Sequence, residues 1–353
     1  MPLGIHSYRD VQSLDDTSAV LNLAWTADER EFLAVDLDAV LREDLAQEIR
    51  SGLDFLHRYF VKDPWAEALL GPAVATFFEQ PPGNWSVTAG AGVGSLIHAL
   101  ARAVDGTAHV VGDTYPDFPF WVEQNGGRCV AYDRSAVRDR FVFVDRPDFI
   151  GIRFAGLDEV VMFCEEVAAD GGIVIVDESN ANYASPRISA VNVAGRLDNV
   201  IVLRGFSKAY GLGALRLGYC VASAKLTDRV RACIPPLLGS SLSLRLGVRI
   251  LELGDITAPL RARILQQKAE LARLLANAGL RGVRESGGFL PYVLVDPPNE
   301  ARAALERSGI AGKMHPMWSS SIGAVRYVYR LSAPLREDRA VLLREKLDGC
   351  SLE

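Results

Sequence analysis

The residues best suited to chemistry lie in the stretch 200–223, which reads VIVLRGFSKAYGLGALRLGYCVAS. An apolar run leads toward Lys208, and a glycine-rich turn separates this lysine from Arg216, after which a second apolar run begins. The pattern predicts a strand that delivers the lysine into a tight loop. A lysine amine can form a Schiff base, and an arginine can hold a phosphate. An exposed loop lysine is the alternative interpretation, but the apolar neighbours leave little solvated surface around Lys208.

Two other polar residues follow strands that should be buried. Asp177 ends the apolar run IVIVD, where an ionised carboxylate is unfavourable without a cationic partner such as a pyridinium N–H. An aspartate that caps the next turn is the alternative. Tyr115 follows the run HVVGD, and the carboxyl ends of strands in an open α/β sheet face the ligand crevice. The Tyr115 ring could stack on a planar cofactor, or it could be an ordinary tyrosine between surface and core.

Anions could be held at two further places. Gly90, Ala91 and Gly92 lie between a predicted strand and a predicted helix, where backbone N–H groups suit a phosphate. Tight packing of the helix on the strand is an equal alternative, and the spacing does not match the G-x-G-x-x-G of dinucleotide-binding proteins. Arg330 interrupts the run VRYVYRLSA and could bind a substrate carboxylate. A surface arginine on an edge strand is the alternative there.

The composition describes an ordinary globular protein. Its 353 residues, 49% hydrophobic and 23% charged, predict a large domain plus a smaller one. The net charge of -6 argues against a nucleic-acid surface. Acidic residues interrupt the N-terminus and the apolar runs are short, so we expect neither a signal peptide nor a membrane span. The five cysteines are widely spaced and show no metal-binding pattern, which indicates reduced thiols in a cytoplasmic protein.

A repeating order of elements must position the candidate residues. From residue 86 onward, apolar strands such as FVFVD and GIVIVDES alternate with helices such as LDEVVMFCEEVAAD. Such strands imply a mostly parallel sheet that is covered on both faces. After residue 228 the pattern changes to helices and then to a small α/β unit with an antiparallel sheet. We therefore expect an N-terminal arm at 1–30, a large domain at 31–255 and a small domain at 256–353 that includes part of the N-terminal segment.

Helical spacing of apolar residues also predicts individual helices. The predicted ranges are 36–59, 65–80 and 257–278, with a further helical stretch from 228 to 253.

The candidates occur in the order glycine-rich turn, tyrosine, aspartate, lysine, arginine, arginine, with SKAYGLGALRLGY as the anchor. In this order the chain resembles the fold-type I pyridoxal-phosphate enzymes of the class I/II aminotransferase family. The resemblance is strongest to the histidinol-phosphate aminotransferase and threonine-phosphate decarboxylase branch, and it extends from about residue 21 to residue 347. It implies an α/β fold, with a mostly parallel sheet of the seven-stranded type in the large domain and a small C-terminal α/β domain. The implied cofactor is pyridoxal 5'-phosphate.

The resemblance also implies a role for each candidate. Lys208 would bind the cofactor covalently and move the proton at the substrate Cα, and Asp177 would keep the pyridine nitrogen protonated. Tyr115 would stack on the ring, and Arg330 would bind the substrate α-carboxylate. The cofactor phosphate would be held by Gly90, Ala91, Gly92, Ser207 and Arg216.

The resemblance further implies a homodimer with shared active sites. Tyr59, in HRYFVKDP, resembles a tyrosine that family members extend to the phosphate of the partner subunit. The substrate would be an α-amino acid as a free small molecule, with neither nucleic acid nor membrane as a partner. Candidates for the lining of the side-chain pocket are Trp25, Tyr115, Phe118, Trp121, His315 and Trp318.

Three positions depart from the pattern of the family. Asp148 stands where an asparagine normally donates to the phenolic oxygen of the cofactor, and an ionised aspartate cannot donate that bond. Asn180 replaces a tyrosine that donates to the same oxygen. Gly205 replaces a serine or threonine, so one phosphate hydroxyl is missing. A charged Asp148 should raise the pKa of the lysine–cofactor linkage by favouring its protonated form, which suggests tuned chemistry.

The function that we favour is therefore that of a pyridoxal-phosphate-dependent aminotransferase that acts on an α-amino acid, with specialised metabolism as its expected setting. The main alternative keeps the cofactor but decarboxylates the amino acid, or eliminates, cyclises or oxidises its side chain, because the bond that breaks depends on orientation. A nicotinamide-dependent enzyme is disfavoured by the spacing of the glycines. A catalytically inactive binding module is disfavoured by the presence of both Lys208 and Asp177.

Overall fold

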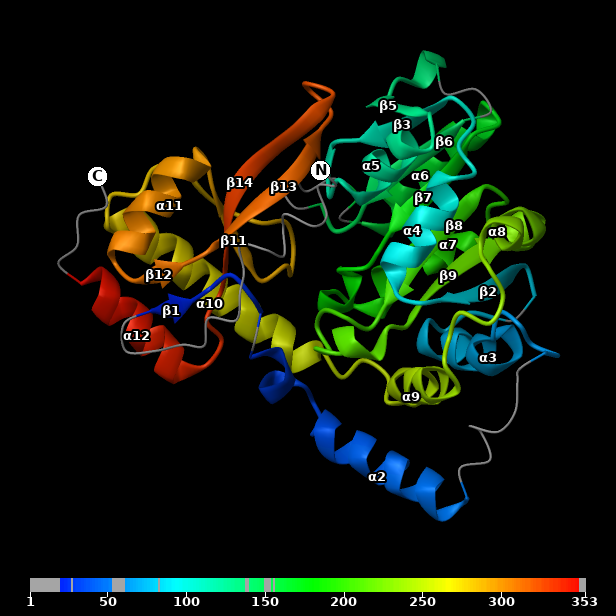
Figure 1. The fold of residues 1–353 in the computed structure, drawn as a ribbon, viewed down its shortest axis with the longest axis horizontal. Helices are drawn as coiled ribbons and strands as arrows, with labels where there is room; N and C mark the ends of the chain where they lie inside the picture. The colour runs from blue at the N-terminus through cyan, green and yellow to red at the C-terminus, as the bar shows by residue number, and fades with distance from the viewer. Residues whose placement is uncertain are drawn as a thin grey trace.

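Two α/β regions lie side by side, each built on its own sheet (Figure 1). The computed structural model describes residues 20–348 except 27, 53–60, 82, 137–139, 149–153 and 155. Tyr59 falls outside these residues.

A sheet of seven described strands forms the centre of the larger region. In spatial order these strands are β2 (Trp85–Gly90), β9 (Gly218–Ser223), β8 (Val200–Gly205), β7 (Ile173–Asp177), β6 (Phe141–Asp145), β3 (Thr107–Val111) and β5 (Arg128–Ala131). The five strands from β8 to β5 are parallel, and β9 is antiparallel to both of its neighbours. The expected mostly parallel sheet is therefore confirmed.

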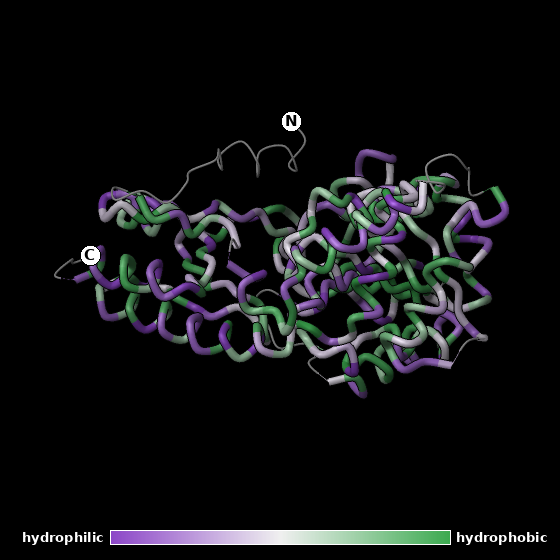
Figure 2. The backbone as a smooth tube through the Cα atoms, turned by 90° about the horizontal axis from the view of Figure 1, so that it is seen from below, coloured by the Kyte–Doolittle hydropathy of each residue, from purple (hydrophilic) through white to green (hydrophobic). Residues whose placement is uncertain are grey.

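Both faces of this sheet are buried, which explains why its strands are apolar throughout. Along β7, Val174 and Val176 join one hydrophobic cluster, while Ile173 and Ile175 join a second cluster on the opposite face. The tube in Figure 2 accordingly shows long hydrophobic stretches inside this region. The helices of the larger region are α3 (Glu67–Phe77), α4 (Val93–Ala101), α5 (Asp117–Gln124), α6 (Leu157–Ala169), α7 (Val191–Ala194), α8 (Thr227–Cys233) and α9 (Ser241–Glu252).

The smaller region is built on an antiparallel sheet, as the sequence predicts. Its described strands, in spatial order, are β10 (Val283–Glu285), β11 (Tyr292–Val295), β14 (Ala324–Ser332), β13 (Lys313–Ser319) and β4 (Asp113–Thr114). The helices α10 (Ala258–Asn277), α11 (Pro298–Arg307) and α12 (Glu337–Leu347) complete the region. A two-stranded pairing of β1 (Leu21–Asn22) with β12 (Ile310–Ala311) holds the N-terminal segment against it.

One connection between the two regions has direct consequences for the site. The short strand β4 leaves the larger region after β3 and pairs with β13, so that it forms one edge of the smaller sheet. Asp113 accepts hydrogen bonds from Ser319 Oγ at 2.8 Å and from Arg326 Nη2 at 2.8 Å. The residue that follows β4 is Tyr115, so the position of this tyrosine depends on both sheets.

Several predicted helices differ from the observed ones. The helix predicted at 36–59 is α2 (Leu37–Arg50), which ends in a turn at Ser51 and projects away from the larger region (Figure 1). The stretch predicted as helical from 228 to 253 is divided by residues 234–240, which include two consecutive prolines and thus break the ladder of helical hydrogen bonds. Among the described helices, none is both long enough and apolar enough to cross a membrane.

Candidate cofactor site

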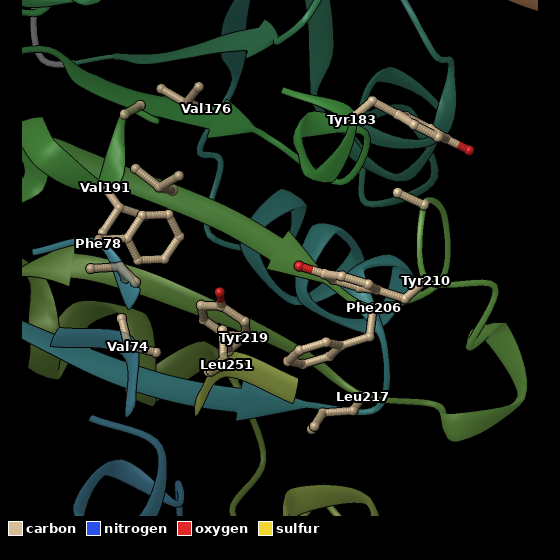
Figure 3. Packing of buried hydrophobic residues seen from close by; sticks show 14 of the residues in the cluster. Val74, Phe78, Val176, Tyr183, Val191, Phe206, Tyr210, Leu217, Tyr219 and Leu251 are labelled. Atoms are coloured by element: carbon tan, nitrogen blue, oxygen red, sulfur yellow. The ribbon is translucent and has the colours of Figure 1, made fainter. Parts of the chain in front are cut away.

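Lys208 and Asp177 lie at the carboxyl edge of adjacent strands. Strand β7 ends at Asp177, which is the register partner of Leu203 on the parallel strand β8. Beyond β8, Phe206 and Tyr210 bury their side chains in the core, as Figure 3 shows, and so anchor the loop that carries Lys208. Burial lowers the pKa of Lys208, as does the positive charge of Arg330, whereas the negative charge of Asp177 opposes this shift. The charges of Lys208 and Asp177 thus act on each other.

Asp177 is buried, and a backbone N–H donates a hydrogen bond to its carboxylate. Its Oδ1 accepts a hydrogen bond from the N–H of Ser179 at 2.8 Å. Burial raises the pKa of Asp177, while this N–H and the charge of Lys208 work in the opposite direction. The side chain of Ser179 also hydrogen-bonds to this carboxylate, so the alternative interpretation, an aspartate that orders the next turn, is compatible with the structure. A ring N–H would be a further donor to the same carboxylate.

The glycine-rich turn and Arg216 meet at the N-terminus of α4. Gly92 is the N-cap residue of α4 and has a φ of 83°, a conformation that glycine adopts without strain. Arg216 donates from Nη2 to the carbonyl of Ala91 at 3.2 Å. A Cβ atom on Gly218 would lie 2.6 Å from the Val93 nitrogen, so helix and strand also pack tightly. Both interpretations of the turn are compatible with this geometry.

The neighbouring strand explains one departure from the family pattern. Gly90 and Gly205 are both register partners of Gly218, on either side of β9. A Cβ atom on Gly205 would lie 2.8 Å from Val93 Cγ2, so a serine or threonine at this position would press against α4. Close packing therefore accounts for the missing hydroxyl. Ser207 lies two residues further along and is partly buried.

Tyr115 faces the smaller region. Its ring centroid lies 5.6 Å from that of His315, and its backbone N–H donates to Asp145 Oδ2 at 3.2 Å. Burial lowers the pKa of His315 well below its ordinary value, and the positive charge of Arg330 adds to this effect, so the imidazole is neutral. Tyr115 is therefore held between the carboxyl edge of the larger sheet and strand β13.

Arg330 is buried on strand β14 rather than exposed on a surface edge. Its guanidinium carbon lies 4.3 Å from the ring centroid of Tyr292, and Nη2 donates to the carbonyl of Ala24 at 3.0 Å. Within the described residues, its buried Nε has no hydrogen-bond partner. An unsatisfied donor of this kind is unfavourable unless a ligand provides an acceptor, and a carboxylate would do so.

The resemblance places Asn180 and Asp148 near the phenolic oxygen of the cofactor. Asn180 is buried, and its Oδ1 has no hydrogen-bond partner in the described part of the chain. Asp148 lines a cavity between the two regions together with Arg146, Ser185 and Phe289. The role assigned to Asp148 by the resemblance remains a prediction, as does that of Tyr59.

Three titratable residues of the site escaped the sequence-based prediction. Asp145 ends β6 directly beside Asp177, and its signal was the same, a carboxylate after a wholly apolar strand. Asp117 opens α5, where burial and the charge of Asp177 raise its pKa to about 6. Lys313 is the register partner of Arg330, and its Nζ lies 5.3 Å from the ring centroid of Trp25. Burial and the charges of Arg330 and Lys208 lower the pKa of Lys313 to about 7.

Some of the residues predicted to line the side-chain pocket lie at the site, and others lie in the hydrophobic core. Trp25 and His315 contact Lys313 and Tyr115 respectively, at the site. Phe118 stacks on Phe143 with 4.4 Å between ring centroids and belongs to the core, as does Trp318. Trp121 packs on His98, with 4.1 Å between ring centroids.

The assembled residues fit pyridoxal 5'-phosphate. A Cβ atom on Gly92 would lie 2.6 Å from Arg216 Nη2, so the absence of a side chain leaves room beside the arginine for a phosphate. The lysine amine suits the aldehyde, and the buried Asp177 suits a protonated ring nitrogen. Asn180, with an unpaired buried oxygen, adds a polar group that a ligand could engage.

Known proteins with related sequences support the same fold and cofactor. The family model of aminotransferase class I and II matches residues 154–318. A threonine-phosphate decarboxylase from Sinorhizobium sp. is 31% identical over 215 residues, and the match spans 60% of this chain and 63% of the relative. A histidinol-phosphate aminotransferase from Pyrococcus furiosus is 25% identical over 254 residues, or 67% of this chain and 71% of the relative.

Solved structures agree over a greater length. The histidinol-phosphate aminotransferase from Sinorhizobium meliloti, in complex with pyridoxal-5'-phosphate, is similar with a TM-score of 0.67 and 22% identity. The superposition covers 94% of this chain and 91% of that one. At this identity the similarity establishes the fold, which confirms the fold class predicted from the sequence.

Proposed function

We propose that this chain is a pyridoxal-phosphate enzyme of the class I and II aminotransferase family and that it transfers the amino group of an α-amino acid. The observation that carries this proposal is the meeting of Lys208 and Asp177 at the ends of the adjacent strands β8 and β7. When bound, pyridoxal phosphate supplies an electron sink that stabilises negative charge at the substrate Cα.

Each residue of the site has a distinct task in this proposal. The lowered pKa of Lys208, which burial causes, favours a neutral amine that can accept the Cα proton and return it. Asp177 holds a proton on the ring nitrogen by its negative charge. Arg330 orients the substrate by pairing with its carboxylate, which would satisfy the unpaired Nε.

The phosphate side of the site orients the cofactor. Gly90, Ala91 and Gly92 precede α4, whose N-terminal N–H groups and dipole favour an anion. Arg216 and Ser207 complete this side of the site. Tyr115 covers the ring, since it is held by Asp145 on one side and faces His315 on the other.

Covalent trapping tests the proposal. Full-length protein is incubated with pyridoxal phosphate, its visible absorbance is recorded, and the lysine linkage is reduced with borohydride and located by peptide mass spectrometry. We expect the adduct on Lys208, and we expect Lys208→Ala to lose it. The exposed Lys225, which pairs with Asp198 on the surface, provides the matched control Lys225→Ala. A protein that stays colourless and unmodified would contradict the cofactor assignment.

Product analysis then separates transamination from its main alternative. The relative with 31% identity is a threonine-phosphate decarboxylase, so an α-decarboxylase is the second candidate. A panel of amino acids, including phosphorylated ones, is screened for spectral change and then for products. A keto acid with aminated cofactor supports transamination. Carbon dioxide or ammonia without amination of the cofactor would favour the alternatives.

We further infer a homodimer in the cytoplasm. Helix α2 projects from the rest of the molecule (Figure 1), and its Ile49 is 64% exposed, so a second subunit packed on α2 would cover this side chain. Tyr59, by its resemblance to the family, would then reach the partner's phosphate site. The buried thiols of Cys129, Cys164 and Cys220 are free, which suits a reducing compartment. Light scattering at micromolar concentration tests the assembly, and a monomer would contradict it.

A further inference from the structure

Two carboxylates lie side by side at the carboxyl edge of the larger sheet. Asp145 on β6 and Asp177 on β7 are register partners on adjacent parallel strands. Register partners in a parallel pair present their side chains on the same face of the sheet. Asp145 is 6% exposed and Asp177 is 5% exposed, so water screens neither charge effectively.

The two carboxylates differ in what stabilises a negative charge. Asp177 accepts a backbone hydrogen bond of 2.8 Å and faces the amine of Lys208. Asp145 accepts longer bonds at Oδ2, 3.2 Å from the N–H of Tyr115 and 3.5 Å from the hydroxyl of Thr114. A short hydrogen bond and a nearby positive charge favour the ionised form, and the charge of Lys208 interacts more strongly with Asp177 than with Asp145, so Asp177 is the better site for the negative charge.

The charged groups around Asp145 reinforce this difference. Asp177 on β7 and Asp148 in the segment after β6 place negative charge near it, and Lys208 after β8 supplies the nearby positive charge. Burial raises the pKa of Asp145 well above its ordinary value, and the charge of Asp177 raises it further. Two adjacent buried carboxylates behave as one titrating pair, in which the first proton is lost much more readily than the second.

We propose that Asp145 is a protonated positioning residue, which shares the carboxyl edge with an ionised Asp177 and fixes the cofactor-covering ring of Tyr115 through its backbone N–H. This inference rests on the proposed function only for the identity of the ring that Tyr115 covers. The pair then carries one negative charge, which matches the single positive charge of a protonated ring nitrogen. A second ionised carboxylate would leave the site with an uncompensated charge.

Infrared spectroscopy of the full-length chain without cofactor tests the protonation state directly. The carbonyl-stretch band of a protonated carboxylic acid is measured at pH 8. At this pH Asp117 and Glu29, whose pKa values burial raises to about 6 and about 7, are mostly ionised. We expect the band in the native protein and its loss in Asp145→Asn. The variant Asp148→Asn is the matched control and should keep the band.

Cofactor affinity tests the positioning role separately. Asparagine at position 145 is neutral and can accept the Tyr115 N–H, so Asp145→Asn should bind pyridoxal phosphate within about twofold of the native protein. Asp145→Ala loses the acceptor, and because one neutral hydrogen bond contributes about 1 kcal/mol, its dissociation constant should rise about fivefold. Far-ultraviolet circular dichroism verifies that each variant is folded.

Distinct outcomes would overturn the inference. A native protein without the acid band at pH 8, or a band that survives in Asp145→Asn, would show that Asp145 is ionised. Unchanged cofactor affinity in Asp145→Ala would show that it does not position Tyr115. If no variant or native protein binds pyridoxal phosphate, the proposed function fails, but the infrared result still decides the protonation of Asp145.

Discussion

Gly92 and Arg216 lie so close together that a methyl group at position 92 would come within 2.6 Å of Arg216 Nη2. The two residues are far apart in the sequence and meet where α4 begins beside strand β9. Gly92 has a φ of 83°, and Arg216 itself has a φ of 50°, which is unusual for a residue with a side chain. Local backbone geometry on both sides therefore holds the guanidinium at the helix N-terminus.

This contact predicts a selective loss of cofactor affinity in Gly92→Ala. The added methyl group would displace the Arg216 side chain and strain the backbone, so the dissociation constant for pyridoxal phosphate should rise about tenfold or more. Fluorescence titration measures the change. Gly94→Ala is the matched control, because a Cβ atom at Gly94 meets nothing within 4 Å and alanine favours a helix. Equal affinities of the two variants would contradict the predicted role of the turn.

A second prediction concerns the buried carboxylate next to Asp177. Glu178 binds Arg146 Nη1 at 2.6 Å and Arg204 Nη1 at 3.0 Å, and all three side chains are buried. Burial alone would raise the pKa of Glu178, but the two guanidinium groups hold it below its ordinary value. Glu178→Gln should therefore destabilise the protein by about 3 kcal/mol or more, because two buried cations lose their partner.

Urea unfolding followed by circular dichroism measures this loss. The exposed ion pair of Lys225 with Asp198 offers a comparison, and Asp198→Asn should change the free energy of unfolding by less than about 1 kcal/mol. Similar effects of the two substitutions would mean that the buried network does not support the fold.

The sequence was sufficient to predict the central sheet and the edge of this sheet at which Asp177 and Lys208 lie. Asp177 and Lys208 each follow an apolar strand, and that local pattern places them at the carboxyl edge whatever the rest of the chain does. Asp145 follows such a strand as well, but its importance depends on its register with Asp177, which local sequence does not encode. Which strands are neighbours in the sheet is decided by the tertiary fold of the whole region.

The contribution of the smaller region was harder to predict for the same reason. Lys313 reaches the site because β13 pairs with β14 and with β4, two partners from different parts of the chain. Strand β13, KMHPMWS, contains a proline and does not show a clear alternation of apolar and polar residues. On the side of β13 that faces away from β14, the described pairing partner is the two-residue strand β4 of the larger region, Asp113 and Thr114. Contacts between distant segments thus account for most of what the sequence did not indicate.

A third prediction concerns the charge of Asp177. Replacing it by asparagine preserves the shape of the side chain but removes the negative charge that keeps the ring nitrogen protonated. Turnover of any accepted amino acid should fall about a hundredfold or more, a magnitude typical for the loss of one preorganised electrostatic contact. Steady-state kinetics measure the effect, and Asp177→Glu should recover part of the activity. A variant Asp177→Asn with nearly native turnover would contradict the assigned role.

The last prediction follows from Lys313. Burial, with the positive charges of Arg330 and Lys208, lowers its folded-state pKa to about 7, whereas the unfolded chain keeps the ordinary value of 10.5. Between these values the unfolded chain binds a proton that the folded protein lacks, so stability rises with pH from about 7 to about 10, by at most about 1.4 kcal/mol per pH unit. Lys313→Met removes the titrating amine and should flatten this rise.

Urea unfolding of the cofactor-free protein at pH 7, 8 and 9 gives the slope for each variant. Lys225→Met provides the control, since Lys225 is exposed and pairs with Asp198 at the surface, and its slope should equal that of the native protein. The methionine at position 313 should also stabilise the protein at pH 7, where the native lysine is half protonated among two other cations. If Lys313→Met retained the native slope, Lys313 would have the same pKa in the folded and unfolded states. Another group would then have to compensate for the positive charges beside Arg330.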